Sequence, residues 1–281
     1  MLPEEIIRSM SCPLQPQPTG LESFGRLPSP LKAVLFDIYG TLLVSASGDI
    51  HAGSMADSFS SDESLRPILR RYQVPLNAHA LQQAVTREIQ RMHCFLRSQG
   101  TDFPEVDIQV IWKALFPEWP NERILSFALE YELAVNPVWP MPGATDLLAL
   151  CRQAGLVMGI ISNAQFYTPL LLRVFFNEEL VSLGFHPSVT LFSYQEAHAK
   201  PSAVLFQKAS NTLQAMGIAP SDTLYLGNDM RKDVIPAAAV GFRTALFAGD
   251  QRSLRGWPSE NEQRPDLLVT DLRQLPDRWL L

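Results

Sequence analysis

The sequence predicts an α/β protein in which a parallel sheet is interrupted by an inserted unit made only of helices. A short apolar run, Leu31–Phe36, ends at Asp37 and a glycine turn, which is typical of a buried strand. From residue 144 onward, strand-like and helix-like segments alternate, which indicates parallel strands covered by helices on both faces. The block between these regions has helical spacing and no convincing strands. We therefore expect a Pro-rich leader at 1–30, a core formed by 31–46 and 141–281, and a helical cap domain at 47–140.

Each later element of the core is predicted from an apolar run or a helical period bounded by turn residues. One helix is expected to carry a proline, Pro201, in its first turn, where the missing N–H costs nothing. The expected helices are 144–154, 168–176, 201–216 and 233–240, and the expected strands are 156–161, 189–193, 223–227, 243–247 and 267–269.

The inserted block shows its clearest helical period at 79–96. There Leu81, Val85, Ile89, Met92 and Leu96 follow one another at spacings of 4, 4, 3 and 4, which puts them on one helix face. Two further helices are expected at 63–72 and 108–115, and a fourth runs to 133 with Asn121 as its N-cap. The small polar stretch 47–60 is expected to be a connector.

Composition excludes several classes of protein. Apolar residues make up 46% of the chain, enough for a sizeable core, and the net charge of −6 without basic runs argues against a nucleic-acid partner. No run of 18 uncharged apolar residues suggests a membrane span, and the first ten residues do not resemble a secretory signal. The three cysteines, Cys12, Cys94 and Cys151, are scattered, as expected of a reduced, cytoplasmic protein. The sequence does not indicate an oligomeric state.

The residues that follow the expected strands decide function, because ligands of parallel sheets bind beyond the carboxyl ends of the strands. An aspartate in this position is able to attack an electrophile, and Mg²⁺ held by hard oxygen ligands offsets the repulsion between carboxylates and a phosphoryl group. An ammonium group and hydroxyls would hold the equatorial oxygens. The side chains available are Asp37 and Thr41, then Ser162 and Asn163, then Lys200, and finally Asp229 and Asp233.

In these residues the sequence resembles the haloacid dehalogenase superfamily of hydrolases. The resemblance runs from Leu31 to about Phe247, and the four motifs of the superfamily occur in order. They are Asp37-Ile-Tyr39-Gly40-Thr41, Ser162-Asn163, Lys200-Pro201 and the stretch from Gly227 to Asp233. The resemblance implies a Rossmann-like core, and the helical insert is similar to the C1-type cap, which closes over the site and selects substrate.

The resemblance also implies roles for individual residues. Asp37 would be the nucleophile, Thr41, Ser162 and Asn163 would bind the transferred group, and Lys200 would bind that group and stabilise charge. Mg²⁺ would be held by Asp37, Asp229, Asp233 and the backbone carbonyl of Tyr39.

The first departure from the superfamily pattern is Tyr39. Phosphatases of the superfamily usually carry aspartate two residues after the nucleophile, as a catalytic acid and base. A phenol with a pKa of about 10 is a poor base at neutral pH, and positioned acid–base catalysis contributes roughly 10²–10⁴-fold. A phosphatase with Tyr39 at this catalytic position is therefore expected to be slow or to prefer good leaving groups. Asp-x-Tyr-Gly-Thr is also the pattern of the superfamily's 2-haloacid dehalogenases, which need no metal.

The second departure lies in the fourth motif. Asn228 stands directly after Gly227, where many members have aspartate, and Asp229 follows. Asn228 and Asp229 are therefore alternative candidates for the metal ligand at this position of the fourth motif. Two carboxylates remain in this motif, which favours Mg²⁺ and phosphate.

Three functions are compatible with these observations. The leading hypothesis is a Mg²⁺-dependent phosphatase or phosphotransferase acting on a small phosphorylated metabolite. The alternatives are a carbon–halogen hydrolase of the 2-haloacid dehalogenase type, and a catalytically weak protein that binds a phosphate ligand. The expected partner is a small anionic molecule, with no nucleic acid and no membrane.

The histidines share no metal-ligand spacing, and Arg66, Arg70 and Arg71 are expected on a solvated helix face.

Overall fold

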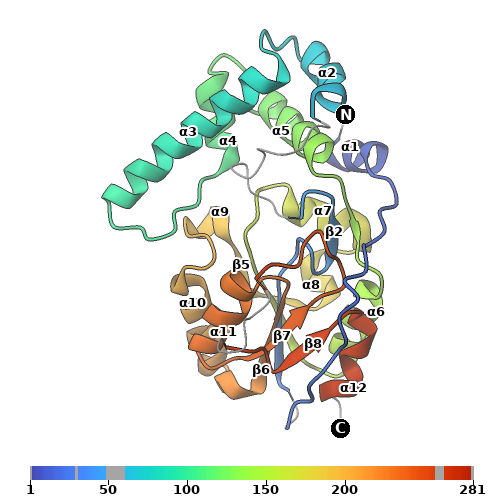
Figure 1. The fold of residues 1–281 in the computed structure, drawn as a ribbon. Helices are drawn as coiled ribbons and strands as arrows, with labels where there is room; N and C mark the ends of the chain where they lie inside the picture. Colours follow the sequence, from blue (N-terminus) through green and yellow to red (C-terminus); the bar gives the residue numbers. More distant parts are fainter. Residues whose placement is uncertain (1, 29–30, 49–60, 257–262, 280–281) are drawn as a thin grey trace.

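The computed structural model describes residues 2–28, 31–48, 61–256 and 263–279, and its centre is one six-stranded parallel sheet (Figure 1). The strand order is β5-β4-β1-β6-β7-β8, and every neighbouring pair is parallel. The predicted α/β class is therefore confirmed. The strands are β1 (Ala33–Phe36), β4 (Val157–Ser162), β5 (Phe185–Phe192), β6 (Thr223–Gly227), β7 (Arg243–Phe247) and β8 (Leu267–Val269).

Both faces of the sheet are covered by helices, which explains why β1 is apolar at every position. Val34 and Phe36 belong to the same apolar cluster as residues of α6 and α7, whereas Ala33 and Leu35 pack with residues of α10 and α11 on the other face. All four side chains of β1 are completely buried. The covering helices are α6 (Ala144–Gln153), α7 (Thr168–Phe176), α10 (Ala203–Ala215) and α11 (Ile235–Ala239).

The chain leaves the core and returns to it through a two-stranded antiparallel ribbon that the sequence did not predict. The strands β2 (Leu43–Ser45) and β3 (Val138–Pro140) pair so that Leu43 lies opposite Pro140 and Ser45 opposite Val138. Strands of three residues are too short to show a period in the sequence. Because the ribbon brings residues 45 and 138 together, the intervening segment is a true insertion with adjacent ends.

In its described part the insert contains four helices. Figure 1 shows them gathered apart from the sheet. They are α2 (Ser61–Arg71), α3 (Ala78–Ser98), α4 (Ile108–Leu115) and α5 (Asn121–Val135). The period at 79–96 is confirmed as α3, which Asn77 caps by accepting a hydrogen bond from the N–H of Ala80 at 2.8 Å. The expected cap at Asn121 is wrong, because Pro120 precedes the helix and Asn121 is its first residue. The expected connector lies largely outside the described residues.

None of the described helices is both long enough and apolar enough to cross a membrane.

The leader is more ordered than its proline content predicted. Its first residues form α1 (Pro3–Met10), which packs against α5 of the insert and α7 of the core. Ile6 and Ile7 are fully buried in these contacts, and Glu4 forms an ion pair with Arg173 of α7. An isolated helix of this length is marginal in water, so tertiary packing and not local propensity stabilises it.

Several element boundaries differ from the expectation. The helix expected from Pro201 begins at Ala203, because Ser202 is its N-cap, and the Lys200–Pro201 peptide bond is cis. The helix expected at 233–240 is a π-helical turn at Met230–Val234 followed by α11. Three short helices were not predicted: α8 (Leu180–Leu183), α9 (Ser193–Glu196) and α12 (Pro276–Trp279).

Candidate active site

Asp37 lies at the carboxyl end of the central strand of the sheet. β1 is flanked by β4 on one side and β6 on the other, and the backbone N–H of Asp37 donates to the carbonyl of Leu226 at 2.8 Å. This bond extends the β1–β6 ladder by one residue and fixes the backbone of Asp37. The side chain therefore emerges where ligands of parallel sheets bind.

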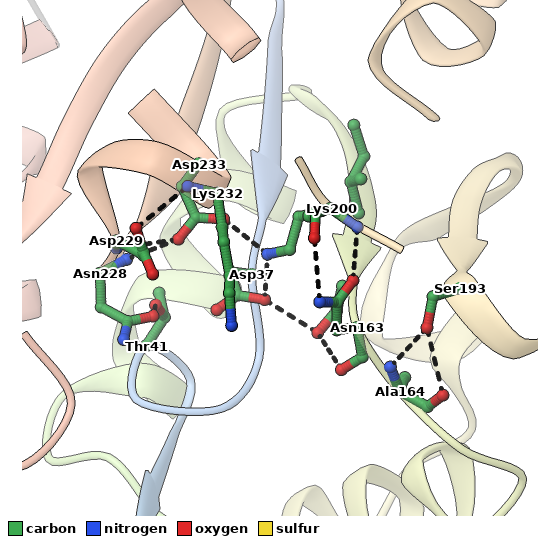
Figure 2. Close-up of polar contacts among 12 residues, drawn as sticks. Asp37, Thr41, Asn163, Ala164, Ser193, Lys200, Asn228, Asp229, Lys232 and Asp233 are labelled. Carbon is green, nitrogen blue, oxygen red and sulfur yellow. Dashed lines mark hydrogen bonds and ion pairs between the residues drawn. The ribbon is translucent and has the colours of Figure 1, made fainter. Parts of the chain in front are cut away.

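The ammonium group of Lys200 connects three buried side chains at the base of the site (Figure 2). Its Nζ lies 2.7 Å from Oδ1 of Asp37, 2.5 Å from Oδ1 of Asp233 and 3.1 Å from the hydroxyl of Tyr225. The Lys200 side chain is 3% exposed. An ammonium group has three N–H donors, and these three acceptors use all of them. The two carboxylates raise the pKa of Lys200 above its usual range against the opposing effect of burial, so this group is cationic at neutral pH.

The carboxyl group of Asp37 has a pKa of about 6, above its usual value. Burial is the largest cause, Lys200 lowers the pKa, and the nearby charge of Asp233 raises it. Both hydrogen bonds to this carboxylate, from Lys200 and from Ser162, reach Oδ1. Among the described residues, no donor reaches Oδ2. One oxygen is thus held in position while the other is available to a ligand in the cleft.

Ser162 and Asn163 follow β4 and both lie in the site, but they make different contacts. The hydroxyl of Ser162, the last residue of β4, is 2.8 Å from Oδ1 of Asp37. The Asn163 amide instead pairs with the backbone of Lys200, accepting from its N–H at 2.7 Å and donating to its carbonyl at 3.4 Å. Asn163 therefore fixes the loop that carries Lys200.

Thr41 lies behind the cleft and contacts the fourth motif. It is fully buried, and its hydroxyl donates to Oδ1 of Asn228 at 3.2 Å. The amide nitrogen of Asn228 donates to the carbonyl of Ser253 at 2.6 Å. A side chain at Gly40 would collide with Ser253, since a Cβ built there lies 2.4 Å from Cβ of Ser253. The segment around Ser253, far along the sequence, thus supports the turn after Asp37, which sequence reasoning did not detect.

The two aspartates of the fourth motif have different surroundings. Asp233 is 1% exposed; its Oδ1 accepts from Lys200 and Tyr225, and its Oδ2 accepts from the N–H groups of Asn228 and Asp229, each at 3.0 Å. Lys200 and the two N–H groups occupy three acceptor positions of the carboxylate, and the hydroxyl of Tyr225 lies within reach of Oδ1 as well as of the carbonyl of Ile161. In Asp229, Oδ1 accepts from two backbone N–H groups at the start of the π-helical turn, and the side chain lines the cleft. Asp233 thus orders the loop, and Asp229 faces the ligand space.

The phenol group of Tyr39 contacts residue Thr168 of α7 and is only 4% exposed. Its hydroxyl lies 2.8 Å from Oγ1 of Thr168, and burial holds its pKa well above the usual value for a phenol. A phenol that ionises only at high pH cannot act as a base at neutral pH.

A cleft opens over Asp37 and collects most of the residues expected from the sequence. Asp37, Tyr39, Asn163, Lys200, Asp229 and Asp233 all line it, whereas Thr41 and Ser162 lie behind it. Sequence reasoning missed four contributors: Tyr225, Gly48, Lys232 and Arg255. An aromatic residue inside a strand is usually read as core, so no sequence signal marked Tyr225. For Lys232 a signal was present but was not used: it is a basic residue inside the fourth motif, between Asp229 and Asp233.

The residues of this cleft fit a Mg²⁺ ion that is bound both by protein carboxylates and by the phosphate oxygens of a substrate. In the described part of the chain, no group of three or more His, Cys, Asp or Glu side chains encloses a metal site. Mg²⁺ usually keeps several waters and binds one or two carboxylates together with substrate phosphate oxygens. Asp37 and Asp229 supply two such carboxylates on the cleft wall. The buried Oγ of Ser253 has no hydrogen-bond partner among the described residues.

Fold and site together define a parallel α/β protein with a polar cleft over an aspartate, Asp37, that follows β1. A family model described as haloacid dehalogenase-like hydrolase matches residues 31–241. The chain belongs to this family.

Two curated relatives are phosphatases. The phosphoserine phosphatase of Thermus thermophilus is 35% identical over 136 residues, which is 48% of this chain and 49% of that protein. The chain thus matches about half the length of that relative. The phosphoglycolate phosphatase of Xylella fastidiosa is 27% identical over 252 residues, covering 88% of this chain and 93% of that protein.

Solved structures with the same fold include both a dehalogenase and a phosphatase. A 2-haloacid dehalogenase from Pseudomonas syringae superposes with a TM-score of 0.55 at 17% identity, covering 88% of this chain and 97% of that one. A phosphatase of the superfamily from Thermococcus onnurineus gives 0.53 at 19% identity, with coverages of 88% and 97%. At these identities the similarity shows the fold alone.

Proposed function

We propose that the protein is a Mg²⁺-dependent phosphatase that acts on a small phosphorylated metabolite through a phosphorylated Asp37. The observation that carries the proposal is the asymmetric environment of the Asp37 carboxylate. Lys200 and Ser162 bind Oδ1, and Oδ2 is left for attack on phosphorus. The phosphatase names of the two relatives reported above support the reaction class.

Each residue of the site has its own role in phosphoryl transfer. Oδ2 of Asp37 forms the bond to phosphorus, and the alkoxide of the substrate leaves on the opposite side. Lys200 keeps Oδ1 oriented and lowers the pKa of Asp37 against the effect of burial. When bound by Asp37 and Asp229, Mg²⁺ would supply charge that neutralises the phosphoryl oxygens. Water then hydrolyses the phosphorylated Asp37 and regenerates the carboxylate.

Either the amide of Asn228 or the carboxylate of Asp229 would bind Mg²⁺, and we assign this role to Asp229. Asn228 already has partners on both atoms of its amide, from Thr41 and to Ser253. Asp229 is also anionic, which Mg²⁺ prefers. Asp233, whose Oδ2 already accepts from the N–H groups of Asn228 and Asp229, would contribute to the metal site by holding the backbone of these two residues.

We further propose that the helical insert acts as a cap that selects substrate. The chain enters and leaves the insert through the β2–β3 ribbon, and β2 begins six residues after Asp37. The same ribbon thus links movement of the insert to the turn that carries the nucleophile.

Dehalogenation is the second candidate, and the residue that favours it is Tyr39. A halide leaves without being protonated, so the absence of an acid at position 39 does not lower the rate of dehalogenation. The carboxylates of Asp37 and Asp229 favour phosphate instead, since they are the hard oxygen ligands that a Mg²⁺ ion shared with a phosphoryl group needs.

The decisive experiment measures product release with and without a chelator. Phosphate release from p-nitrophenyl phosphate is expected in the presence of Mg²⁺ and is expected to stop when EDTA is added. A panel of 2-haloacids run in parallel is expected to give no halide. Halide release that persists in EDTA, without phosphatase activity, would replace the proposal with the dehalogenase.

A further inference from the structure

The connection between α3 and α4 of the insert docks on the core beside the loop that carries Lys200. We call its residues 102–108 the docking segment. Figure 1 shows the chain between α3 and α4 next to α9 of the core. The docking segment lies far along the sequence from the β2–β3 ribbon, so it attaches the insert to the core at a second place.

The docking segment pairs with the backbone of the chain that leads into Lys200. The carbonyl of Phe103 accepts from the N–H of Ala199 at 2.8 Å, and the N–H of Glu105 donates to the carbonyl of Ala197 at 3.1 Å. An antiparallel bridge lies between these two bonds. Because Ala199 directly precedes Lys200, the backbone of the insert holds the residue next to the buried ammonium carrier.

Side chains fasten the docking segment at both of its ends. At the start, the carboxylate of Asp102 accepts from the hydroxyl of Ser202, with O···O distances of 2.9 and 3.1 Å. At the other end, the buried amide of Gln165 donates to the carbonyl of Val106 and accepts from the N–H of Ile108, both at 2.9 Å. Gln165 therefore binds the backbone of the insert through both polar atoms of its amide.

These contacts flank the pair that Lys200 forms with Asn163. The Asn163 amide binds the backbone N–H and carbonyl of Lys200, as Figure 2 shows. Ser202 follows Lys200 by two residues, and Gln165 follows Asn163 by two. The docking segment thus holds the chain close to both members of this pair.

One residue of the loop has a backbone conformation that needs support from its neighbours. Ala197 has a φ of +56°, in the left-handed region that residues with a Cβ adopt at a cost. Its carbonyl is the acceptor for the N–H of Glu105. If the docking segment were released, the loop would lose a hydrogen bond at the residue whose conformation is least favourable.

The helices of the insert reach the reacting groups indirectly. Among the described residues, no side chain of α2–α5 lines the cleft over Asp37. Lys200, by contrast, orients Oδ1 of Asp37 at 2.7 Å. The docking segment therefore gives these helices a connection to the Asp37 carboxylate that requires no contact with the ligand.

We propose that the docking segment positions Lys200, and through it Asp37, for attack on phosphorus, with Gln165 and Asp102 as the positioning residues. This inference rests on the proposed function and assigns the insert a role in turnover. Docking and ligand binding are then coupled. A ligand that requires an oriented Asp37 strengthens the docking, and docking strengthens the binding of that ligand by the same factor.

Leucine at position 165 removes both bonds to the docking segment and keeps the size of the side chain. In Gln165→Leu, kcat for p-nitrophenyl phosphate is expected to fall at least about fivefold while KM changes less than about twofold. Hydrogen exchange followed by mass spectrometry is expected to be at least about fivefold faster in 103–108 and in 197–200.

A second pair of variants tests the other end of the docking segment. Asp102→Ala removes the acceptor for Ser202 and is expected to lower kcat and speed exchange in 197–200 in the same direction. Asp102→Asn keeps an oxygen acceptor and is expected to restore both quantities toward the wild-type values. The matched control is Gln109→Leu, since the amide of Gln109 donates to Asp107 within the insert. It is expected to keep the wild-type kcat and exchange.

A phosphoryl analogue tests the coupling in the wild-type protein. With saturating Mg²⁺, orthovanadate is expected to slow exchange in 103–108 at least about fivefold, and Gln165→Leu is expected to bind it at least about fivefold more weakly. Exchange in 103–108 that is unchanged by bound vanadate would overturn the proposal. So would a Gln165→Leu variant that is less stable but keeps the wild-type kcat.

Failure of the proposed function gives a different result. A wild-type protein that binds no vanadate and releases no phosphate from any ester would contradict the phosphatase itself. Failure of the docking proposal leaves the wild-type activity intact, so the two failures are distinguishable.

Discussion

The hydroxyl group of Tyr225 lies 3.1 Å from the ammonium nitrogen of Lys200, within hydrogen-bonding distance at the buried base of the site. The same hydroxyl is 2.7 Å from the carbonyl of Ile161 and 3.0 Å from Oδ1 of Asp233. Tyr225 therefore joins β4, β6 and the fourth motif at one point. Because it accepts the third N–H of Lys200, it fixes the direction in which the ammonium group approaches Asp37.

Removing this hydroxyl is expected to lower turnover more than substrate affinity. Tyr225→Phe keeps the ring, whose edge contact with Phe206 has a centroid distance of 5.2 Å, and removes the acceptor for Lys200. We expect kcat to fall about tenfold with little change in KM, and stability to fall by about 1–3 kcal/mol, since a buried carbonyl and an N–H lose a partner. Steady-state kinetics and urea unfolding measure the two effects.

The control for this substitution is Tyr194→Phe, which removes the hydroxyl of a tyrosine in α9 that bonds to Gln195. It is expected to leave kcat unchanged. A Tyr225→Phe variant with reduced stability and wild-type kcat would show that the hydroxyl supports the fold and does not position Lys200.

Asparagine at position 37 is expected to abolish turnover while the fold is kept. Asp37→Asn preserves the size of the side chain, and Lys200 still has the Asp233 carboxylate as its partner. Without an anionic nucleophile, kcat is expected to fall by at least about 10³-fold. Mass spectrometry of acid-quenched wild-type enzyme is expected to show a phosphoryl group on the peptide that contains Asp37. Full phosphatase activity in Asp37→Asn would contradict the assignment of Asp37 as the nucleophile.

The acidic side of the pH profile reports the ionisation of Asp37. Burial raises the pKa of Asp37 to about 6, so the carboxyl group is protonated and inactive below that pH. We expect kcat/KM to increase as pH rises through about 6, and to do so at lower pH when Mg²⁺ is saturating, because a bound cation favours the carboxylate. A profile that stays flat from pH 4 to pH 7 at limiting Mg²⁺ would contradict this.

The site residues that follow strands were predictable from the sequence, whereas Tyr225 and Arg255, which do not directly follow a strand, were not. The apolar run before Asp37 and the position of Lys200 after another strand were sufficient to bring these two side chains together. Tyr225 lies inside a strand and has no neighbouring motif, so only the hydrogen bonds in the structure distinguish it from a core residue. Arg255 reaches the site through a loop whose path no local pattern specifies.

The assignment of Asp233 illustrates a second limit. A carboxylate near a metal is either a ligand or a support, and the sequence contains nothing that distinguishes the two. The difference depends on which donors surround it, and here the N–H groups of Asn228 and Asp229 occupy Oδ2. Likewise, α1 was not expected because its stability comes from packing on α5 and α7, which are distant in sequence.

The phenol of Tyr39 is expected to make no chemical contribution. Tyr39→Phe removes only the bond to Thr168, and burial already prevents ionisation near neutral pH. We expect kcat for p-nitrophenyl phosphate to change less than about threefold, and the rate across a series of esters to fall steeply as the leaving group becomes more basic. A loss of about 10²-fold in Tyr39→Phe, restricted to esters with basic leaving groups, would instead show that the phenol donates a proton.

A half-buried carboxyl group in the insert is expected to make stability depend on pH. Burial raises the pKa of Glu132, near the end of α5, to about 7, although hydrogen bonds with Tyr167 and Asn136 lower it in part. In the folded protein this group keeps its proton to higher pH than in the unfolded chain. Its contribution to stability is therefore complete below about pH 4.5, the ordinary value for glutamate, and is lost as pH rises through about 7.

Glutamine at position 132 replaces the ionisable carboxyl group with a neutral amide of the same size. Urea unfolding of Glu132→Gln and wild type is expected to show a stability difference that moves in favour of the variant by about 1–3 kcal/mol between pH 4.5 and pH 7.5. Comparing the two proteins at each pH cancels the titration of the other groups, since they are shared. Glu122→Gln, at the exposed start of the same helix, is the matched control. A difference that is constant across this range, or that grows toward acid pH, would show that Glu132 is ionised in the folded protein, with the charge stabilised by Tyr167 and Asn136.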